Sequence, residues 1–134
     1  MVDSFWHNKK VLITGDTGFK GSWLTCLLLK LGSLITGISL ENNKSYLLYE
    51  ELKKDTKFKE YISHKKYKHY ELDIREGEKL NKLIKEIAPE IIFHMAAQPL
   101  VIESYKNPLY TWQTNVMGTV NLLEVARELD ACSI

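Results

Sequence analysis

A short glycine-rich turn joins a buried strand to an amphipathic helix near the start of the chain. Residues 10–14, KVLIT, form a β-branched run that predicts a strand, and the segment TGDTGFKGSW at 14–23 places three glycines at a spacing of three. Leucines recur at helical spacing over 19–31, and Gly32 stands where a helix C-cap glycine belongs. Residues 34–40, LITGISL, show no polar alternation, which is typical of a parallel strand covered on both faces.

The rest of the chain continues to alternate between strand and helix patterns. Because such alternation builds a parallel sheet with helices on both faces, we expect an α/β fold, a Rossmann-type doubly wound parallel sheet with about four strands present. After the second strand we expect a polar loop with one or two short helices over 41–68, and then a third strand in HYELDI that ends near Asp73. A helix through 80–87, stopped by Pro89, leads to a fourth strand in EIIFHMAA at 90–97. A loop containing Pro99 and Pro108 then precedes a long helix from about 110 to 129.

Composition narrows the classes of partner. The 134 residues suffice for one domain, and 45% hydrophobic with 26% charged residues is ordinary for a globular protein. A net charge of +1 gives no one-signed field that would favour nucleic acid or an anionic membrane, so an anion must be bound locally. Cys26 and Cys132 lie far apart and suggest neither a zinc site nor a disulfide scaffold. With no secretory signal pattern at the N-terminus, we expect a cytoplasmic protein and no metal.

The glycines have two interpretations. Gly15, Gly18 and Gly21 form G-x-x-G-x-x-G, which differs from the dinucleotide fingerprint G-x-G-x-x-G but stands in the same place, between the first strand and the first helix. Glycine permits positive φ and lets a pyrophosphate approach the backbone, while free N–H groups at the helix start face the anion. The alternative is a turn with close helix-to-strand packing.

Residues further along favour a cofactor. Glu41, at the end of the second strand and twenty residues after Gly21, is placed to accept hydrogen bonds from an adenosine ribose, which favours NAD over NADP; the alternative is a solvated loop residue. Asp73, at the end of the third strand, is placed to reach an adenine edge. Ala96 and Ala97 leave room for a cofactor that crosses the carboxyl edge of the sheet.

These motifs together resemble the extended short-chain dehydrogenase/reductase superfamily. That superfamily carries TGxxGxxG, an acidic residue after the second strand, D-I/V after the third and AA after the fourth, and its fourth helix resembles TNVMGTVNLLEVAR at 114–127. Within it, FW at 5–6, TGDTGFKGSWL and FHMAAQPLV are similar to the CDP-glucose 4,6-dehydratase family in particular.

The resemblance implies a role for individual residues. The predicted contacts to the NAD pyrophosphate are Gly15, Gly18, Gly21 and the backbone of Phe19 and Lys20. Those to adenine are Asp73 and Ile74, and those to the ribose and nicotinamide side are Ala96, Ala97 and Gln98. Asn115 matches the asparagine that supports the active site in this superfamily; otherwise it is a helix-surface amide. His94 matches the FH of the family, and we interpret it as structural rather than catalytic.

The implied reaction of the complete enzyme is an internal redox. Hydride leaves C4 of the sugar of CDP-glucose for NAD, water is lost across C5 and C6, and the hydride returns to C6. The superfamily's catalytic Ser or Thr and its Tyr-x-x-x-Lys follow a fifth strand, which we expect to begin at the end of this sequence, near Ile134. Residues 1–134 are therefore interpreted as the N-terminal part of an NAD-binding domain, inactive alone, from an enzyme that forms a homodimer or higher homo-oligomer.

Two departures from the family pattern and three alternatives remain. The family commonly has histidine in place of Asp16, so we expect this carboxylate to lie near the pyrophosphate and weaken NAD binding, unless it caps the helix. It tends to have arginine in place of Ile102, which puts any contact of that arginine in doubt. The alternatives are another sugar-nucleotide dehydratase or epimerase, a non-catalytic nucleotide-binding module, and nucleic-acid binding through Lys53 to Lys68, which we disfavour because acidic residues interrupt the run.

Overall fold

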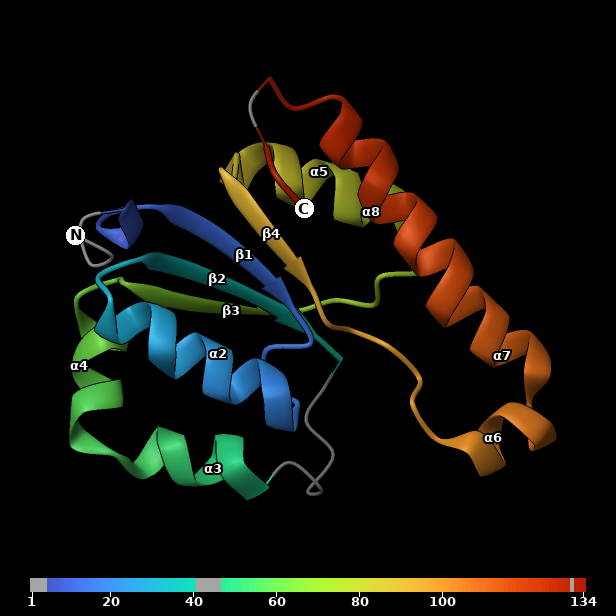
Figure 1. Cartoon of the computed structure of the whole chain (residues 1–134), viewed down its shortest axis with the longest axis horizontal. Coiled ribbons are helices and arrows are strands. Elements are labelled where there is room, and N and C mark those ends of the chain that lie inside the picture. The colour runs from blue at the N-terminus through green and yellow to red at the C-terminus, as the bar shows by residue number, and fades with distance from the viewer. Residues whose placement is uncertain (1–4, 41–46, 131) are drawn as a thin grey trace.

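A four-stranded parallel sheet forms the centre of the computed structural model, which describes residues 5–40, 47–130 and 132–134 (Figure 1). The strands are β1 (Lys10–Thr14), β2 (Leu34–Ser39), β3 (Tyr67–Glu71) and β4 (Ile91–His94), in the order β3-β2-β1-β4. Val11 is in register with Ile35 on β2 and with Ile91 on β4, and Ile35 is in register with Tyr67 on β3. The Rossmann-type arrangement expected from the sequence is confirmed.

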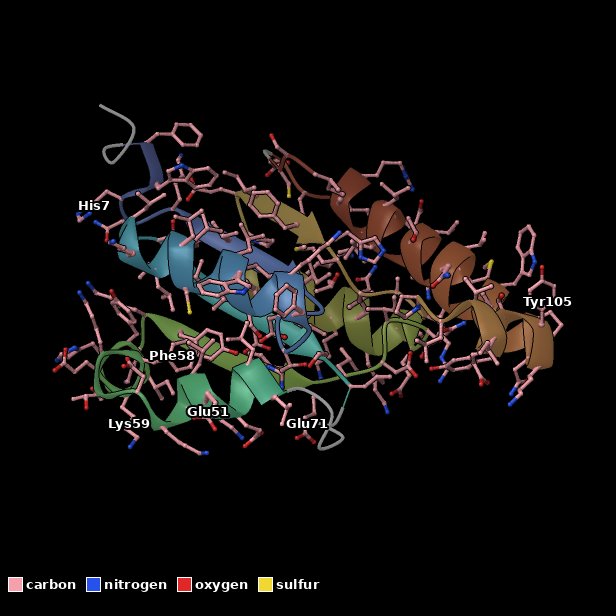
Figure 2. All side chains as sticks on the ribbon, turned by 60° about the horizontal axis from the view of Figure 1, so that its bottom comes forward. His7, Glu51, Phe58, Lys59, Glu71 and Tyr105 are labelled. Atoms are coloured by element: carbon pink, nitrogen blue, oxygen red, sulfur yellow. The ribbon has the colours of Figure 1, made fainter. Side chains whose placement is uncertain are left out.

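Helices cover both faces of the sheet (Figure 1). On one face lie α2 (Phe19–Lys30), α3 (Leu47–Lys54) and α4 (Thr56–Ser63), and on the other lie α5 (Gly77–Ile87) and α8 (Gly118–Arg127). Alternate residues of β1 supply the two cores: Val11 and Ile13 pack on the α2 face, and Leu12 packs on the α5 face. Figure 2 shows Phe58 turned inward from α4, where it is buried, and its neighbour Lys59 turned outward.

Two predictions made from the sequence are observed: the glycine that follows α2, and the short helices in the polar segment. Gly32 follows the helix with φ +92°, a conformation that side chains with a Cβ rarely adopt, and its N–H donates to the Leu29 carbonyl at 3.0 Å. The polar segment contains α3 and α4, which are amphipathic and bury Tyr49 and Phe58 beneath them. Tyr49 and Phe58 are therefore core residues.

The third and fourth strands differ from prediction in their ends. β3 runs from Tyr67 to Glu71, about two residues earlier than HYELDI suggested, because Tyr67 is buried against the α2 face and pairs with Ile35. β4 ends at His94. The Met95 N–H still donates to the Thr14 carbonyl at 3.0 Å, but the Ala96 N–H donates to the Thr14 hydroxyl at 3.2 Å and so leaves the backbone ladder. Ala96 and Ala97 thus lie in the loop after the strand.

The predicted long helix begins and ends about two residues earlier than expected and is less regular. It comprises α7 (Pro108–Trp112), a π-helical segment η1 (Gln113–Met117) and α8, and it is preceded by a short helix α6 (Val101–Lys106) where a loop was expected. α6 and α7 extend beyond the sheet, and Tyr105 on α6 is 83% exposed (Figures 1 and 2). π-Helical turns occur often at functional sites, and this one contains Asn115.

The end of the sequence lies beside β4. Ser133 forms a parallel bridge with Ile91, and the Ile92 N–H donates to the Ser133 carbonyl at 2.8 Å. A fifth strand was expected to begin near Ile134, and the bridge to Ile91 lies next to that position. None of the helices within the described ranges is long and apolar enough to cross a membrane.

Candidate functional site

The glycine turn holds the first strand, the first helix and the loop after β4 in close contact. Gly15 has φ +76°, and its N–H donates to the Ile38 carbonyl at 2.7 Å. A Cβ on Gly15 would lie 2.8 Å from the Ala96 nitrogen, and a Cβ on Gly21 would lie 2.0 Å from the Gly15 carbonyl oxygen. Both positions therefore require glycine for packing, whatever the turn binds. The packing interpretation and the cofactor interpretation are compatible.

The N-terminus of α2 is open to an anion. Its N-cap, Gly18, makes no side-chain cap hydrogen bond, and the first turn contains no acidic residue. The first N–H groups of a helix have no intrahelical partners, and the helix dipole favours negative charge there. Phe19 and Lys20 at this end are exposed. Their backbone N–H groups are thus available at the position predicted for the pyrophosphate.

A cleft opens beside this turn, outside the carboxyl ends of the strands. In a doubly wound sheet, ligands bind at this edge, where the strand order reverses between β1 and its neighbours. The cleft brings together six of the predicted site residues, Gly15, Gly18, Asp73, Ile74, Ala96 and Ala97. Its further lining residues are Thr17, Ser39, Leu40, Leu72, Met95, Tyr110 and Thr114.

Other predicted residues lie outside the lining. Gly21, Phe19, Lys20, Gln98 and Asn115 do not line this cleft. Glu41 falls outside the described residues.

Thr114 is a site residue that the sequence did not indicate. It is 8% exposed and lines the cleft from η1, and its Oγ1 accepts or donates no hydrogen bond within the described part of the chain. Buried hydroxyls are nearly always paired, so an orphaned one facing a cleft is a candidate ligand contact. In the sequence Thr114 is one threonine in a helical run, which offers no signal of this role.

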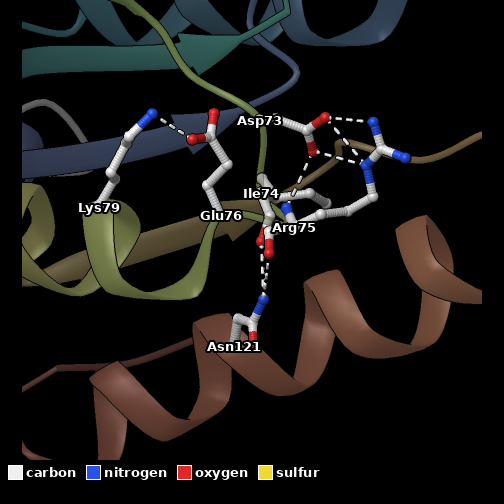
Figure 3. A network of polar contacts seen from close by, with 6 residues as sticks. All are labelled: Asp73, Ile74, Arg75, Glu76, Lys79 and Asn121. Carbon is white, nitrogen blue, oxygen red and sulfur yellow. Dashed lines mark hydrogen bonds and ion pairs between the residues drawn. The ribbon is translucent and has the colours of Figure 1, made fainter.

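The turn after β3 is fixed by a polar network that reaches α8 (Figure 3). The Asp73 carboxylate accepts from Arg75 Nε at 2.9 Å and from Arg75 Nη2 at 2.5 Å, and these hydrogen bonds hold the pKa of Asp73 below its usual value. Asn121 Nδ2 on α8 donates to the Ile74 carbonyl at 3.0 Å. Arg75 also lies over the Tyr110 ring, 4.7 Å from its centroid. Asp73 therefore remains charged and oriented without a ligand.

A chain of hydrogen bonds through His94 links β1 to η1. Thr14 Oγ1 accepts from the N–H groups of Met95 and Ala96, so its own proton is available to His94 Nδ1 at 2.7 Å. His94 Nε2 must then carry the ring proton, which it donates to Thr119 Oγ1 at 2.9 Å. Thr119 donates in turn to the Asn115 carbonyl at 2.7 Å. Burial lowers the pKa of His94, which favours the neutral ring that this chain of bonds requires.

Asn115 is half-buried and bonded, unlike a helix-surface amide. Its Oδ1 accepts from the Gln98 N–H at 2.7 Å, and its Nδ2 donates to the Gln98 carbonyl at 3.0 Å. Gln98 in turn donates through Nε2 to Thr111 Oγ1 at 2.9 Å. These bonds clamp the loop after β4 onto the helix and so fix the wall of the cleft formed by Ala96 and Ala97.

Neither predicted position of Asp16 is observed. The helix is not capped by Asp16, because Gly18 is the N-cap and receives no side-chain bond. The Asp16 side chain points into the protein beneath the glycine turn and is 0% exposed. It is hydrogen-bonded to Tyr67 and His69. The expectation that its charge faces a bound pyrophosphate was wrong, because the glycine at position 37 leaves room for the side chain over the sheet.

The two Tyr-x-x-x-Lys spacings inside the chain do not line the cleft. Tyr49 is buried under α3, and Lys53 pairs with Glu50 at 2.7 Å. Tyr61 packs beside the core of the α2 face, and Lys65 follows α4. Both pairs belong to the face opposite α5 and α8, so their spacing is coincidental.

Comparison with known proteins decides the family. A sequence model of the GDP-mannose 4,6 dehydratase family matches residues 12–133. The chain belongs to this family. It is 44% identical over 130 residues to the CDP-glucose 4,6-dehydratase of Salmonella typhimurium, covering 96% of this chain and 34% of that protein. The residues that suggested the extended superfamily thus identified it correctly.

Solved structures of the dehydratase's wider relatives share the fold. The UDP-Glc/GlcNAc 4-epimerase of Campylobacter jejuni superposes with a TM-score of 0.75 at 26% identity, covering 91% of this chain and 34% of that one. The UDP-glucose-4-epimerase of Stenotrophomonas maltophila, solved with bound NAD, gives a TM-score of 0.71 at 25% identity, covering 92% and 35%. The chain spans about a third of the length of the proteins that it matches.

The buried His94 gives the fold a measurable dependence on pH. Because the pKa of His94 is lower in the folded chain than the usual 6.5, the unfolded chain takes up a proton that the folded chain does not, and stability falls as pH is lowered through that range. We expect urea unfolding between about pH 7.5 and about pH 5.5 to show a smaller loss of stability for His94→Gln than for the wild type.

The exposed His64 provides the control for this measurement, and we expect His64→Gln to keep the pH dependence of the wild type. Equal pH dependence for His94→Gln and the wild type would contradict the neutral, bonded His94.

Proposed function

We propose that this chain is the NAD-binding part of a sugar-nucleotide 4,6-dehydratase. The observation that carries the proposal is the cleft at the carboxyl edge of the sheet, in which residues from the glycine turn, the turn after β3 and the loop after β4 converge. Residues 1–134 would form the N-terminal part of the NAD-binding domain. The sequence match to a CDP-glucose 4,6-dehydratase supports this family of reactions.

The residues of the cleft fit NAD. We assign the pyrophosphate to Gly15, where a Cβ is excluded, to Gly18, and to the N-terminus of α2, whose first N–H groups have no intrahelical partners. The packing role of Gly21 supports this turn. The adenine is assigned to Asp73 and Ile74, and the ribose and nicotinamide side to Ala96, Ala97 and the orphaned Thr114 hydroxyl. Glu41 remains the candidate for the adenosine ribose.

NAD, when bound, accepts and returns a hydride. The chain's own part is to hold and orient it: Asn115 fixes the Gln98 backbone, and Thr14 fixes the N–H groups of Met95 and Ala96. The described residues of the cleft include no tyrosine–lysine pair at the family's spacing. We therefore propose that the proton-transfer residues and the sugar-nucleotide site come from chain beyond residue 134.

The substrate proposed is CDP-glucose, converted to CDP-4-dehydro-6-deoxyglucose. Incubation of the complete gene product with CDP-glucose and NAD should yield a 4-keto sugar nucleotide, and GDP-mannose or UDP-glucose should not be turned over comparably. Turnover of another sugar nucleotide instead would favour a sister dehydratase or epimerase. NAD binding without any turnover would favour a non-catalytic nucleotide-binding module.

We propose that the complete protein is cytoplasmic and that it self-associates. The apolar surface of the last helices supports the self-association. Large apolar side chains are exposed along one helical run, and they are Leu109, Trp112, Val116, Met117, Val120 and Leu123. A homodimer or higher homo-oligomer of the complete protein would bury such a surface, as helix-mediated symmetric interfaces do.

Filling the cleft should weaken cofactor binding without unfolding the chain. Ala97 is exposed and lines the cleft, so Ala97→Leu inserts apolar bulk where the cofactor would cross. We expect calorimetry to show NAD binding to the wild type and an affinity about tenfold weaker for Ala97→Leu, given the usual cost of overpacking.

Ser63→Leu, on the exposed end of α4, is the matched control and should leave NAD affinity unchanged. If Ala97→Leu binds NAD as tightly as the wild type, the cofactor does not occupy this cleft.

A further inference from the structure

The side chain of Asp16 lies buried under the glycine turn, on the α2 face of the sheet. Its exposed fraction is 0%, and its Oδ2 lies 2.6 Å from the Tyr67 hydroxyl and 2.8 Å from His69 Nδ1. Both partners belong to β3, the edge strand, two strands away from the β1 strand that leads into the turn. A residue of the turn is thus bonded across the sheet to its far edge.

A glycine in the intervening strand makes this reach possible. Gly37 on β2 is in register with Ile13 on β1 and with His69 on β3, directly beneath the path of the Asp16 side chain. A Cβ on Gly37 would lie 1.8 Å from Asp16 Oδ2. Glycine is uncommon within a strand and often marks a close approach of other atoms. Asp16, Gly37 and the two β3 partners therefore depend on one another.

The direction of the hydrogen bonds follows from the chemistry of the groups. An ionised carboxylate only accepts, so the Tyr67 hydroxyl and His69 Nδ1 must both donate to Asp16. Burial, with the nearby charge of Asp16, raises the pKa of Tyr67, which keeps this hydroxyl a donor. Hydrogen bonds to a buried charge are stronger than those between neutral groups. The contact is thus a strong attachment of the turn to β3.

Backbone contacts connect this attachment to the cleft. The Asp16 carbonyl accepts from Ser22 Oγ on α2 at 3.1 Å, and Thr17 Oγ1 lies 2.9 Å from Ser39 Oγ at the end of β2. Asp16 follows Gly15 directly and precedes Gly18 by two residues, and both glycines line the cleft. A shift of Asp16 would therefore move the backbone assigned to the pyrophosphate.

We propose that Asp16, held by Tyr67 and His69 across Gly37, is a positioning residue that sets the conformation of the glycine turn for cofactor binding. The cofactor part of this inference rests on the proposed function. The carboxylate acts from beneath the turn and does not itself contact the cofactor. Asp16→His would break both bonds and weaken NAD binding.

The test uses Asp16→Asn and the milder Tyr67→Phe in the whole chain. We expect both to shift the amide NMR signals of Gly15 and Gly18 in the absence of ligand, and to weaken NAD binding, about tenfold for Asp16→Asn and less for Tyr67→Phe. Tyr70→Phe is the matched control, since Tyr70 lies on β3 but on the partly exposed opposite face. It should leave the glycine signals and NAD affinity unchanged.

A second control separates positioning from general stability. Ile84→Val weakens the core of the α5 face, and it should lower the melting temperature without changing NAD affinity or the Gly15 and Gly18 signals. Unshifted glycine signals in both Asp16→Asn and Tyr67→Phe would overturn the positioning role. Shifted signals with no NAD binding by the wild type would instead support the structural attachment and overturn the proposed function. If Asp16→Asn does not fold, Tyr67→Phe decides.

Discussion

The close approach of the glycine turn to the loop after β4 is the constraint on which the rest of the structure depends. With only hydrogen at the Gly15 α-carbon, the Ala96 backbone can pass where a Cβ would lie 2.8 Å from its nitrogen. That contact brings the ends of β1 and β4 and the start of α2 to one edge of the sheet. The absence of a Cβ on Gly21 allows α2 to pack onto the same turn. A cleft beside the N-terminus of α2 is the consequence.

Polar side chains then fix the walls of the cleft from behind. One chain of contacts runs from Thr14 through His94 and Thr119 to the Asn115 backbone, and the Asn115 side chain holds Gln98. A second joins the turn after β3 to Asn121 on α8 (Figure 3). On the opposite face, Asp16 ties the glycine turn to β3. Since these contacts exist within the chain itself, the cleft is organised before any ligand arrives, which reduces the ordering cost of binding.

Periodicity and glycine chemistry predicted the architecture, because they report on burial and on backbone conformation. The lack of polar alternation in β1 and β2 and the glycine after α2 are local signals of this kind. Strand ends were less predictable. β4 ends where the Ala96 N–H donates to the Thr14 hydroxyl, and these two residues are distant in sequence. The π-helical segment has no local signal either. Asp16 was misjudged because proximity in sequence does not say on which side of the turn a side chain lies; the isolated Gly37 within a strand was the available clue.

We propose that the carboxyl edge of this sheet is an NAD site assembled around the glycine turn. The most direct measurement is an amide-resolved NMR titration of the chain with NAD. We expect shifts to concentrate at the residues that line the cleft, which are Gly15, Gly18, Asp73, Ile74, Ala96, Ala97 and Thr114. Shifts confined to α3 and α4, or no shifts at saturating NAD, would contradict this proposal.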